Sequence, residues 1–131
     1  MISYLKEVFP QVNGKFDILE LGKETTIVKL KVQKADLRPG DTVSGPSMFL
    51  LADVSFYIAV LNLIGPRPLA VTTNCSINFL RKPKPTDLIG QSKIFKSGRN
   101  LIVGEVTLKS ELVGPAVAHA TFTYAIPQKN N

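Results

Sequence analysis

The sequence has few of the residues on which many small proteins build reactive centres: one cysteine, one histidine and no tryptophan. A single thiol, Cys75, excludes an intrachain disulfide and any zinc site built from several cysteines. His119 lies between two alanines in a predicted strand, which is more typical of a structural histidine, and no Ser-His-Asp triad can be assigned. No Gly-rich phosphate-binding loop is present, and we predict no metal site.

Acidic residues are also in the minority, with 10 against 16 basic residues and a net charge of +6. This balance favours anionic partners and leaves nucleic acid, phosphorylated molecules and acidic surfaces all open. The basic residues gather between Arg81 and Arg99, where Asp87 is the single acid. The 131 residues, 44% of them apolar, fit one domain over residues 1–131. Because the start of the sequence does not resemble a signal peptide, we expect a cytoplasmic protein.

The hydrophobic pattern predicts a short helix, two strands, one long helix and four further strands. Alternation of apolar and polar residues marks the strand at residues 26–33. The short connections between the last four predicted strands imply antiparallel neighbours. The same alternation predicts that Thr72 and Asn74 share one face of their strand. The predicted elements are a helix at residues 2–9, strands at 15–21 and 26–33, a helix at 47–64, and strands at 69–80, 87–96, 101–110 and 116–126.

The predicted long helix is apolar nearly all round, so we expect it to be buried on most sides. Ser44 can cap it, Pro46 is tolerated in its first turn, and Gly65 followed by proline ends it. A membrane-spanning helix is the alternative, but the run is short for that role and contains Asp53. The element order predicts an α+β domain, with one antiparallel sheet curled around the helix.

Asp53 stands out because a carboxylate among apolar residues is costly unless it has a partner or a function. The helix start at Gly45 offers backbone N–H groups that favour negative charge. Gly45 and Asp53 are eight residues apart, which is roughly 12 Å along a helix at ~1.5 Å per residue. One small reacting group can therefore meet both only if they come from two different chains.

Three segments carry a resemblance to a known family: LRPGDTVSGPSMFLLADVSFYIAV, LAVTTNCSINFLRKPKPTDLIG and KSGRNLIVGEVTL. They resemble the hotdog-fold acyl-CoA thioesterases, in particular the phenylacetyl-CoA thioesterase-like branch. The resemblance implies an antiparallel curved sheet wrapped around one long buried helix. It also implies acyl-CoA substrates, with CoA as part of the substrate and no separate cofactor, and self-association as a dimer or a dimer of dimers.

The resemblance also implies roles for individual residues. Asp53 matches the catalytic carboxylate, acting as nucleophile or as general base, and Gly45 matches an oxyanion donor to the thioester oxygen. Ser44 and Thr72 would help to position the substrate or the attacking water. The acyl group would lie along Phe49, Phe56 and Tyr57, although core packing explains those side chains equally well. The CoA phosphates would meet basic residues and a turn: Arg81, Lys82, Lys84, Gly98 and Arg99.

The sequence departs from the family pattern at three positions: Ser44 replaces a histidine, Pro46 a glycine, and Arg38 an asparagine. The missing histidine disfavours the hydratase chemistry of related hotdog proteins. We therefore predict an acyl-CoA thioesterase with a site shared between two subunits, and keep a non-catalytic acyl-CoA-binding protein as the alternative. Nucleic-acid binding through the basic cluster is weaker, because no aromatic residues interleave with it, and no membrane insertion is expected.

Overall fold

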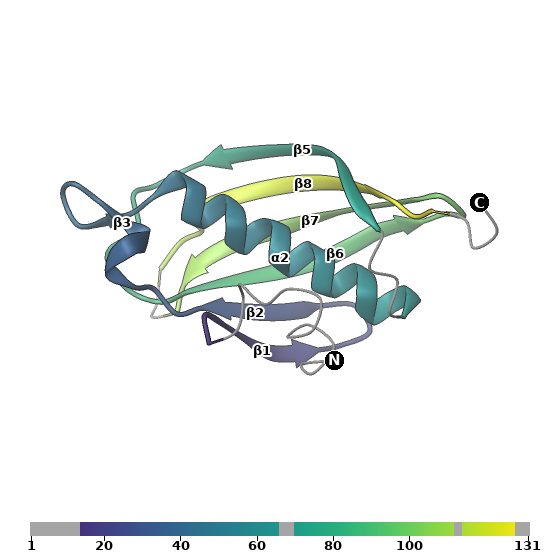
Figure 1. Cartoon of the computed structure of the whole chain (residues 1–131), viewed down its shortest axis with the longest axis horizontal. Helices are drawn as coiled ribbons and strands as arrows, with labels where there is room; N and C mark the ends of the chain where they lie inside the picture. The colour runs from purple at the N-terminus through teal and green to yellow at the C-terminus, as the bar shows by residue number, and fades with distance from the viewer. Residues whose placement is uncertain (1–13, 66–69, 112–113, 128–131) are drawn as a thin grey trace.

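One long helix lies across one face of a six-stranded antiparallel sheet (Figure 1). The structure, a computed structural model, describes residues 14–65, 70–111 and 114–127, so the predicted helix at residues 2–9 lies outside the described residues. The sheet has the strand order β1-β2-β6-β7-β8-β5. The elements are β1 (Phe16–Leu21), β2 (Thr26–Leu30), α2 (Gly45–Ile64), β5 (Val71–Phe79), β6 (Leu88–Ser97), β7 (Leu101–Ser110) and β8 (Ala118–Ala125).

This arrangement confirms the predicted α+β class and the hotdog architecture. The predicted strand at residues 26–33 is shorter than expected, since β2 ends at Leu30 and a single turn of 3-10 helix, η2 (Lys34–Asp36), follows. The chain leaves the ladder at this point because the Val32 N–H donates to Oδ1 of Asp87, at 2.9 Å, instead of to a neighbouring strand.

A short hairpin leads into the helix, formed by two strands of two residues each, β3 (Leu37–Arg38) and β4 (Thr42–Val43). Its turn places Gly40 at φ 98° and Asp41 at φ 56°. Glycine adopts this left-handed conformation without a steric cost, and aspartate tolerates it better than most residues. The tight turn delivers the chain to the N-terminus of α2.

The core lies between α2 and the sheet, as the apolar character of the helix predicted. Leu51, Phe56 and Leu61 are at most 1% exposed. Gly90 and Gly104 allow the close approach, because an added Cβ would collide with Ser55 and with the Phe56 ring, respectively. The helix is long and apolar enough to span a membrane, but 61% of its most apolar 18-residue window is buried in the protein. It is the core helix of the fold.

Strand β5 forms one edge of the sheet and is exposed along most of its length. Its register against β8 shifts between Thr72 and Asn74. As a result Thr72 pairs with the buried Tyr124, whereas Asn74 pairs with Thr123 on the opposite face. The prediction that Thr72 and Asn74 share a face is therefore wrong, because a β-bulge at Thr73 adds one residue to the strand.

Candidate functional site

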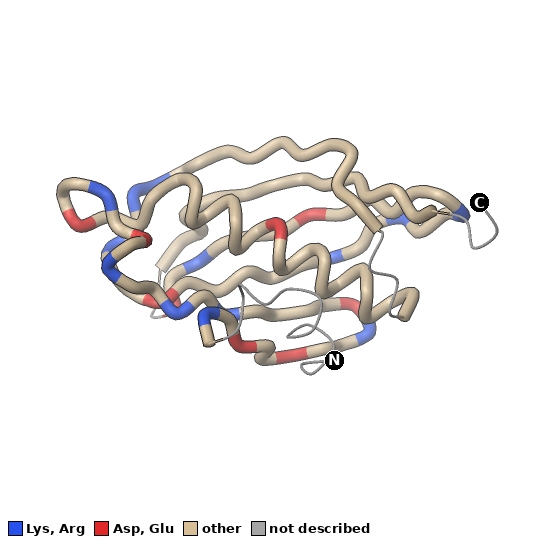
Figure 2. Tube along the Cα trace, in the orientation of Figure 1, with Lys and Arg blue, Asp and Glu red and all other residues tan. Residues whose placement is uncertain are grey.

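Asp53 is the only charged residue of α2, and Figure 2 shows the helix with a single acidic position along its length. Its side chain is half-buried and faces β5 and β8. The Thr72 hydroxyl donates to Oδ1 of Asp53 at 2.9 Å, and the Tyr124 hydroxyl donates to the same oxygen at 2.8 Å. Two neutral donors thus compensate the partial burial of the carboxylate without neutralising its charge.

Tyr124 is the member of this cluster that the sequence did not reveal. It is 2% exposed and belongs to an aromatic group with Phe56, Tyr57 and Phe122. Burial and the negative charge of Asp53 raise the pKa of Tyr124 far above its ordinary value, so the phenol remains a proton donor at neutral pH. In the sequence, Tyr124 looks like any inward-facing residue of an alternating strand, and only the folded contact distinguishes it.

The first turn of α2 leaves one backbone donor free. The Ser44 side chain caps the helix by accepting from the Ser47 N–H at 3.2 Å, and the Met48 N–H donates to the Ser44 carbonyl at 3.0 Å. Pro46 has no N–H to donate. Within the described part of the chain, the Gly45 N–H has no acceptor. An N–H at a helix start is suited to a developing negative charge, as the sequence predicted for Gly45.

A buried carboxylate, Asp36, holds this helix start in place. Asp36 is 4% exposed; its side chain accepts from Lys15 at 2.9 Å and from the Ser47 hydroxyl at 2.8 Å. Its carbonyl accepts from the Ser44 N–H at 2.7 Å. Burial acts to raise the pKa of Asp36, but the Gln33 N–H, Lys15 and Ser47 together hold it below its ordinary value. Sequence reasoning missed Asp36, because one acid in an irregular segment has no distinguishing pattern.

The Ser44 hydroxyl belongs to the same network. It donates to the Ser47 hydroxyl at 3.0 Å, and Ser47 in turn donates to Asp36. In this arrangement the Ser44 hydroxyl donates its single proton to Ser47 and not to a ligand. A ligand at the helix start would meet the Gly45 N–H first.

The predicted phosphate-binding residues lie in two groups, one at each end of the sheet. Figure 2 shows basic positions at both ends. Arg81, Lys82 and Lys84 are exposed and follow β5, and the Val43 N–H donates to the carbonyl of the intervening Pro83 at 3.2 Å. They therefore lie at the end that holds the start of α2. Gly98 and Arg99 lie in the turn between β6 and β7, at the opposite end.

The two predicted halves of the catalytic site are also apart within one chain. Gly45 lies beside the end of β5, since a Cβ added to it would stand 3.6 Å from the Phe79 ring. Asp53 is bonded to Thr72, near the start of the same strand. The seven residue-to-residue steps from Thr72 to Phe79 span roughly 23 Å at about 3.3 Å per step. One chain therefore does not bring Gly45 and Asp53 to one reacting group.

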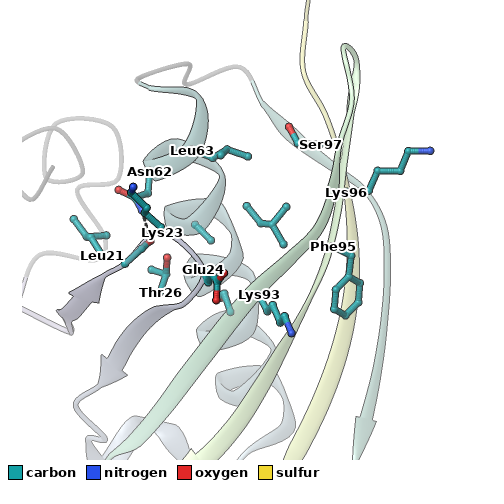
Figure 3. A pocket seen from close by; sticks show the side chains of 14 residues that line it. Leu21, Lys23, Glu24, Thr26, Asn62, Leu63, Lys93, Phe95, Lys96 and Ser97 are labelled. Carbon is teal, nitrogen blue, oxygen red and sulfur yellow. Dashed lines mark hydrogen bonds between the residues drawn. The ribbon is translucent and has the colours of Figure 1, made fainter.

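A cavity of about 780 Å³ lies elsewhere, at the C-terminal end of α2 (Figure 3). It is lined by the turn after β1, the end of the helix and the second half of β6, and Asn62, in its lining, donates to the Gly22 carbonyl at 3.0 Å. None of the predicted site residues lines this cavity. Among the described residues, no group of three His, Cys, Asp or Glu side chains could hold a metal ion.

Phe56 and Tyr57, predicted as possible acyl contacts, are 0% and 4% exposed and belong to the core. Phe49 is different, because it is 39% exposed on the surface of α2. Of the three aromatic residues, only Phe49 presents a large apolar surface to a ligand or a second chain.

Comparison with known proteins agrees with this fold. The family model of the thioesterase superfamily matches residues 40–114, more than half of the 131-residue chain. A proposed thioesterase from Silicibacter sp. TM1040 is 52% identical, with a TM-score of 0.90 over 97% of this chain and 89% of that one. None of the curated proteins matches the chain.

Two further solved structures show how widely the fold is shared. A protein from Streptococcus mutans UA159, solved bound to acetyl-CoA, is 28% identical, with a TM-score of 0.75 over 86% of this chain and 88% of that one. A variant of the phenylacetic acid degradation protein PaaI from Thermus thermophilus is 23% identical, with a TM-score of 0.78 over 90% of this chain and 99% of that one.

These matches show that the chain belongs to the thioesterase superfamily. The resemblance found in the sequence is confirmed, and with it the enzyme class of thioester hydrolase.

Proposed function

We propose that the protein hydrolyses an acyl-CoA thioester to a carboxylic acid and free CoA. The observation that carries this proposal is the Asp53 carboxylate, half-buried in an apolar helix and bonded through one oxygen, with Oδ2 left unbonded by the described residues. The presence of acetyl-CoA in the Streptococcus mutans relative supports a CoA ester as the substrate. CoA then enters as substrate, and the chemistry proposed here uses no separate cofactor.

The reaction needs a nucleophile, an oxyanion donor and a leaving group. Asp53 acts either as a general base on water or as a nucleophile that forms a mixed anhydride, which water then hydrolyses. In the general-base route a C–O bond forms, the water proton passes to Asp53, and the C–S bond breaks to release CoA thiolate, which takes up the proton. The Gly45 N–H stabilises the negative charge on the carbonyl oxygen during attack.

The proposed site is shared between two chains. Asp53 and Gly45 lie beside opposite ends of β5, the exposed edge strand. If two β5 edges pair antiparallel, Thr72 of one chain comes opposite Phe79 of the other. This pairing brings Asp53 of one chain toward Gly45 of its partner, and it covers an edge that would otherwise invite aggregation. We therefore propose a dimer as the smallest active unit.

The same pairing explains the divided basic residues. Arg81, Lys82 and Lys84 of one chain would meet the Gly98-Arg99 turn of its partner, since antiparallel pairing exchanges the two ends of the sheet. Several cations would then face one entrance, as the phosphates of CoA require. A cytoplasmic location fits this proposal, because it gives the protein access to acyl-CoA.

The test is hydrolysis of a panel of short, long and aromatic acyl-CoA esters by the wild-type protein and by Asp53→Asn. Asn keeps the shape of the side chain and removes the base. We expect turnover of at least one ester, and a loss of about 100-fold or more in Asp53→Asn. Equal rates in the two proteins across the panel would show that Asp53 does not carry the reaction.

The alternative is a protein that binds acyl-CoA without turnover. Pro46 supplies no N–H, and the Ser44 proton is donated to Ser47, so the oxyanion end retains a single backbone donor. This alternative predicts saturable binding of CoA esters in calorimetry and hydrolysis no faster than in buffer. Measurable turnover that depends on Asp53 excludes it.

A further inference from the structure

The Tyr124 hydroxyl is held rigidly against the carboxylate of Asp53. It donates to Oδ1 at 2.8 Å and lies 3.3 Å from the Asp53 backbone carbonyl oxygen. The ring is 2% exposed and packs edge-on against Phe56, with centroids 5.2 Å apart, and against Phe122 at 6.3 Å. A phenol confined in this way cannot follow the carboxylate if it rotates. It therefore fixes the orientation of the carboxylate.

Both donors to the carboxylate use the same oxygen. Thr72 from β5 and Tyr124 from β8 bond to Oδ1, and no group in the described part of the chain bonds to Oδ2. The two carboxylate oxygens are thus made unequal: one is anchored to the sheet, and the other keeps its lone pairs for an incoming proton or carbonyl carbon.

We propose that Tyr124 is a positioning residue for the reaction, which anchors Oδ1 together with Thr72 and leaves Oδ2 as the reacting atom. This inference rests on the proposed role of Asp53. Two other titratable groups lie close by: Cys75 on β5, whose thiol pKa is raised by burial and by Asp53, and Tyr57 on α2, whose ring is tilted against Tyr124 at 6.2 Å. The hydroxyls that donate to Oδ1 are those of Tyr124 and Thr72, so these are the groups to alter.

The experiment measures kcat and KM separately in the wild type, Tyr124→Phe, Thr72→Val and the double variant. Tyr124→Phe keeps the ring and removes only the donor. Because the anchored carboxylate acts in the transition state and does not hold the bound ester, loss of the donor should lower kcat about tenfold and leave KM close to the wild-type value. A defect of packing alone would disturb the whole site and raise KM as well as lower kcat. An unchanged kcat in Tyr124→Phe, or a loss of kcat accompanied by an equal rise in KM, would overturn the inference.

A second readout does not depend on turnover. The carboxyl-carbon NMR signal of Asp53, in protein labelled at aspartate and assigned with Asp53→Asn, should change its chemical shift at neutral pH in Tyr124→Phe, because a hydrogen bond to the carboxylate is lost. If no ester is hydrolysed but this signal moves, the proposed function fails and the coupling of Tyr124 to Asp53 stands. If turnover depends on Asp53 but neither readout moves, the inference on Tyr124 fails alone.

Discussion

The hydroxyl of Thr72 lies 2.9 Å from Oδ1 of Asp53 and joins the exposed edge strand to the core helix. Because of the bulge at Thr73, Thr72 faces the helix while Asn74, two residues later, faces away from it. An edge that pairs with a second chain would therefore be coupled directly to the carboxylate proposed to carry the reaction.

Replacing Thr72 by valine should lower kcat/KM about tenfold, because a hydrogen bond to a charged group contributes about 1.5 kcal/mol or more. Thr72→Ser retains the hydroxyl and should stay close to the wild type. Thr73→Val is the matched control, since the Thr73 hydroxyl donates to the Thr123 carbonyl instead of to Asp53. Steady-state kinetics should show a lower kcat/KM in Thr72→Val and near wild-type values in Thr72→Ser and Thr73→Val. An equal loss of kcat/KM in Thr73→Val would contradict the prediction.

Removing the Gly45 N–H, which has no acceptor among the described residues, should damage the reaction while sparing the fold. Gly45→Pro deletes the N–H at the first helical position, where proline is tolerated, and should lower kcat about 100-fold. Gly45→Ala keeps the N–H, and its Cβ would make an ordinary 3.6 Å contact with Phe79, so it should remain active. Kinetics measures the loss of activity, and thermal unfolding measures any loss of stability. Full activity in Gly45→Pro would exclude an oxyanion role for this N–H.

Asp36 should make stability depend on pH. Its folded pKa lies below the ordinary 3.8, so its contribution is fully present above about pH 4 and is lost as pH falls toward the folded value. Asp36→Asn breaks a buried ion pair and should cost about 3 kcal/mol of unfolding free energy at neutral pH. Urea unfolding from neutral to acidic pH should show the gap between wild type and variant narrowing below about pH 4.

Asp17→Asn provides the comparison for Asp36. Its pair with Lys31 is 3.5 Å long and joins side chains that are 45% and 40% exposed, so its loss should cost less than about 0.5 kcal/mol. Similar losses in the two variants, or a gap for Asp36→Asn that stays constant with pH, would show that the buried network does not stabilise the helix start.

Because α2 lies close to the sheet, we expect stability to fall when Gly104 is replaced by a larger residue. In Gly104→Ala the new methyl group would collide with the Phe56 ring and the Lys93 carbonyl, which should cost about 1–3 kcal/mol of unfolding free energy. In Gly98→Ala the methyl group would meet only the Leu101 carbonyl, at 3.5 Å, and stability should hardly change. Denaturant unfolding measures both, and a fully stable Gly104→Ala protein would contradict the packing described here.

The sequence allowed the helix, most of the strands and the position of Asp53 to be predicted, because local patterns carry them. Alternation could not supply the strand order, in which β5 pairs with β8, since that pairing joins residues far apart in the chain. The prediction that Asn74 shares a face with Thr72 was wrong, because one bulged residue between them reverses the alternation of side chains. Tyr124 and Asp36 were missed because their roles exist only as contacts between distant segments, which no local pattern encodes.

The division of the site between two chains is tested most directly by mixing two inactive variants, Asp53→Asn and Gly45→Pro. In a mixed dimer, Gly45 of the first chain and Asp53 of the second form one intact site, and the other site carries both changes. Activity should return after subunit exchange, to about a quarter of the wild-type value if exchange is random. Mixed dimers that form, as seen by native mass spectrometry, but remain inactive would contradict a shared site.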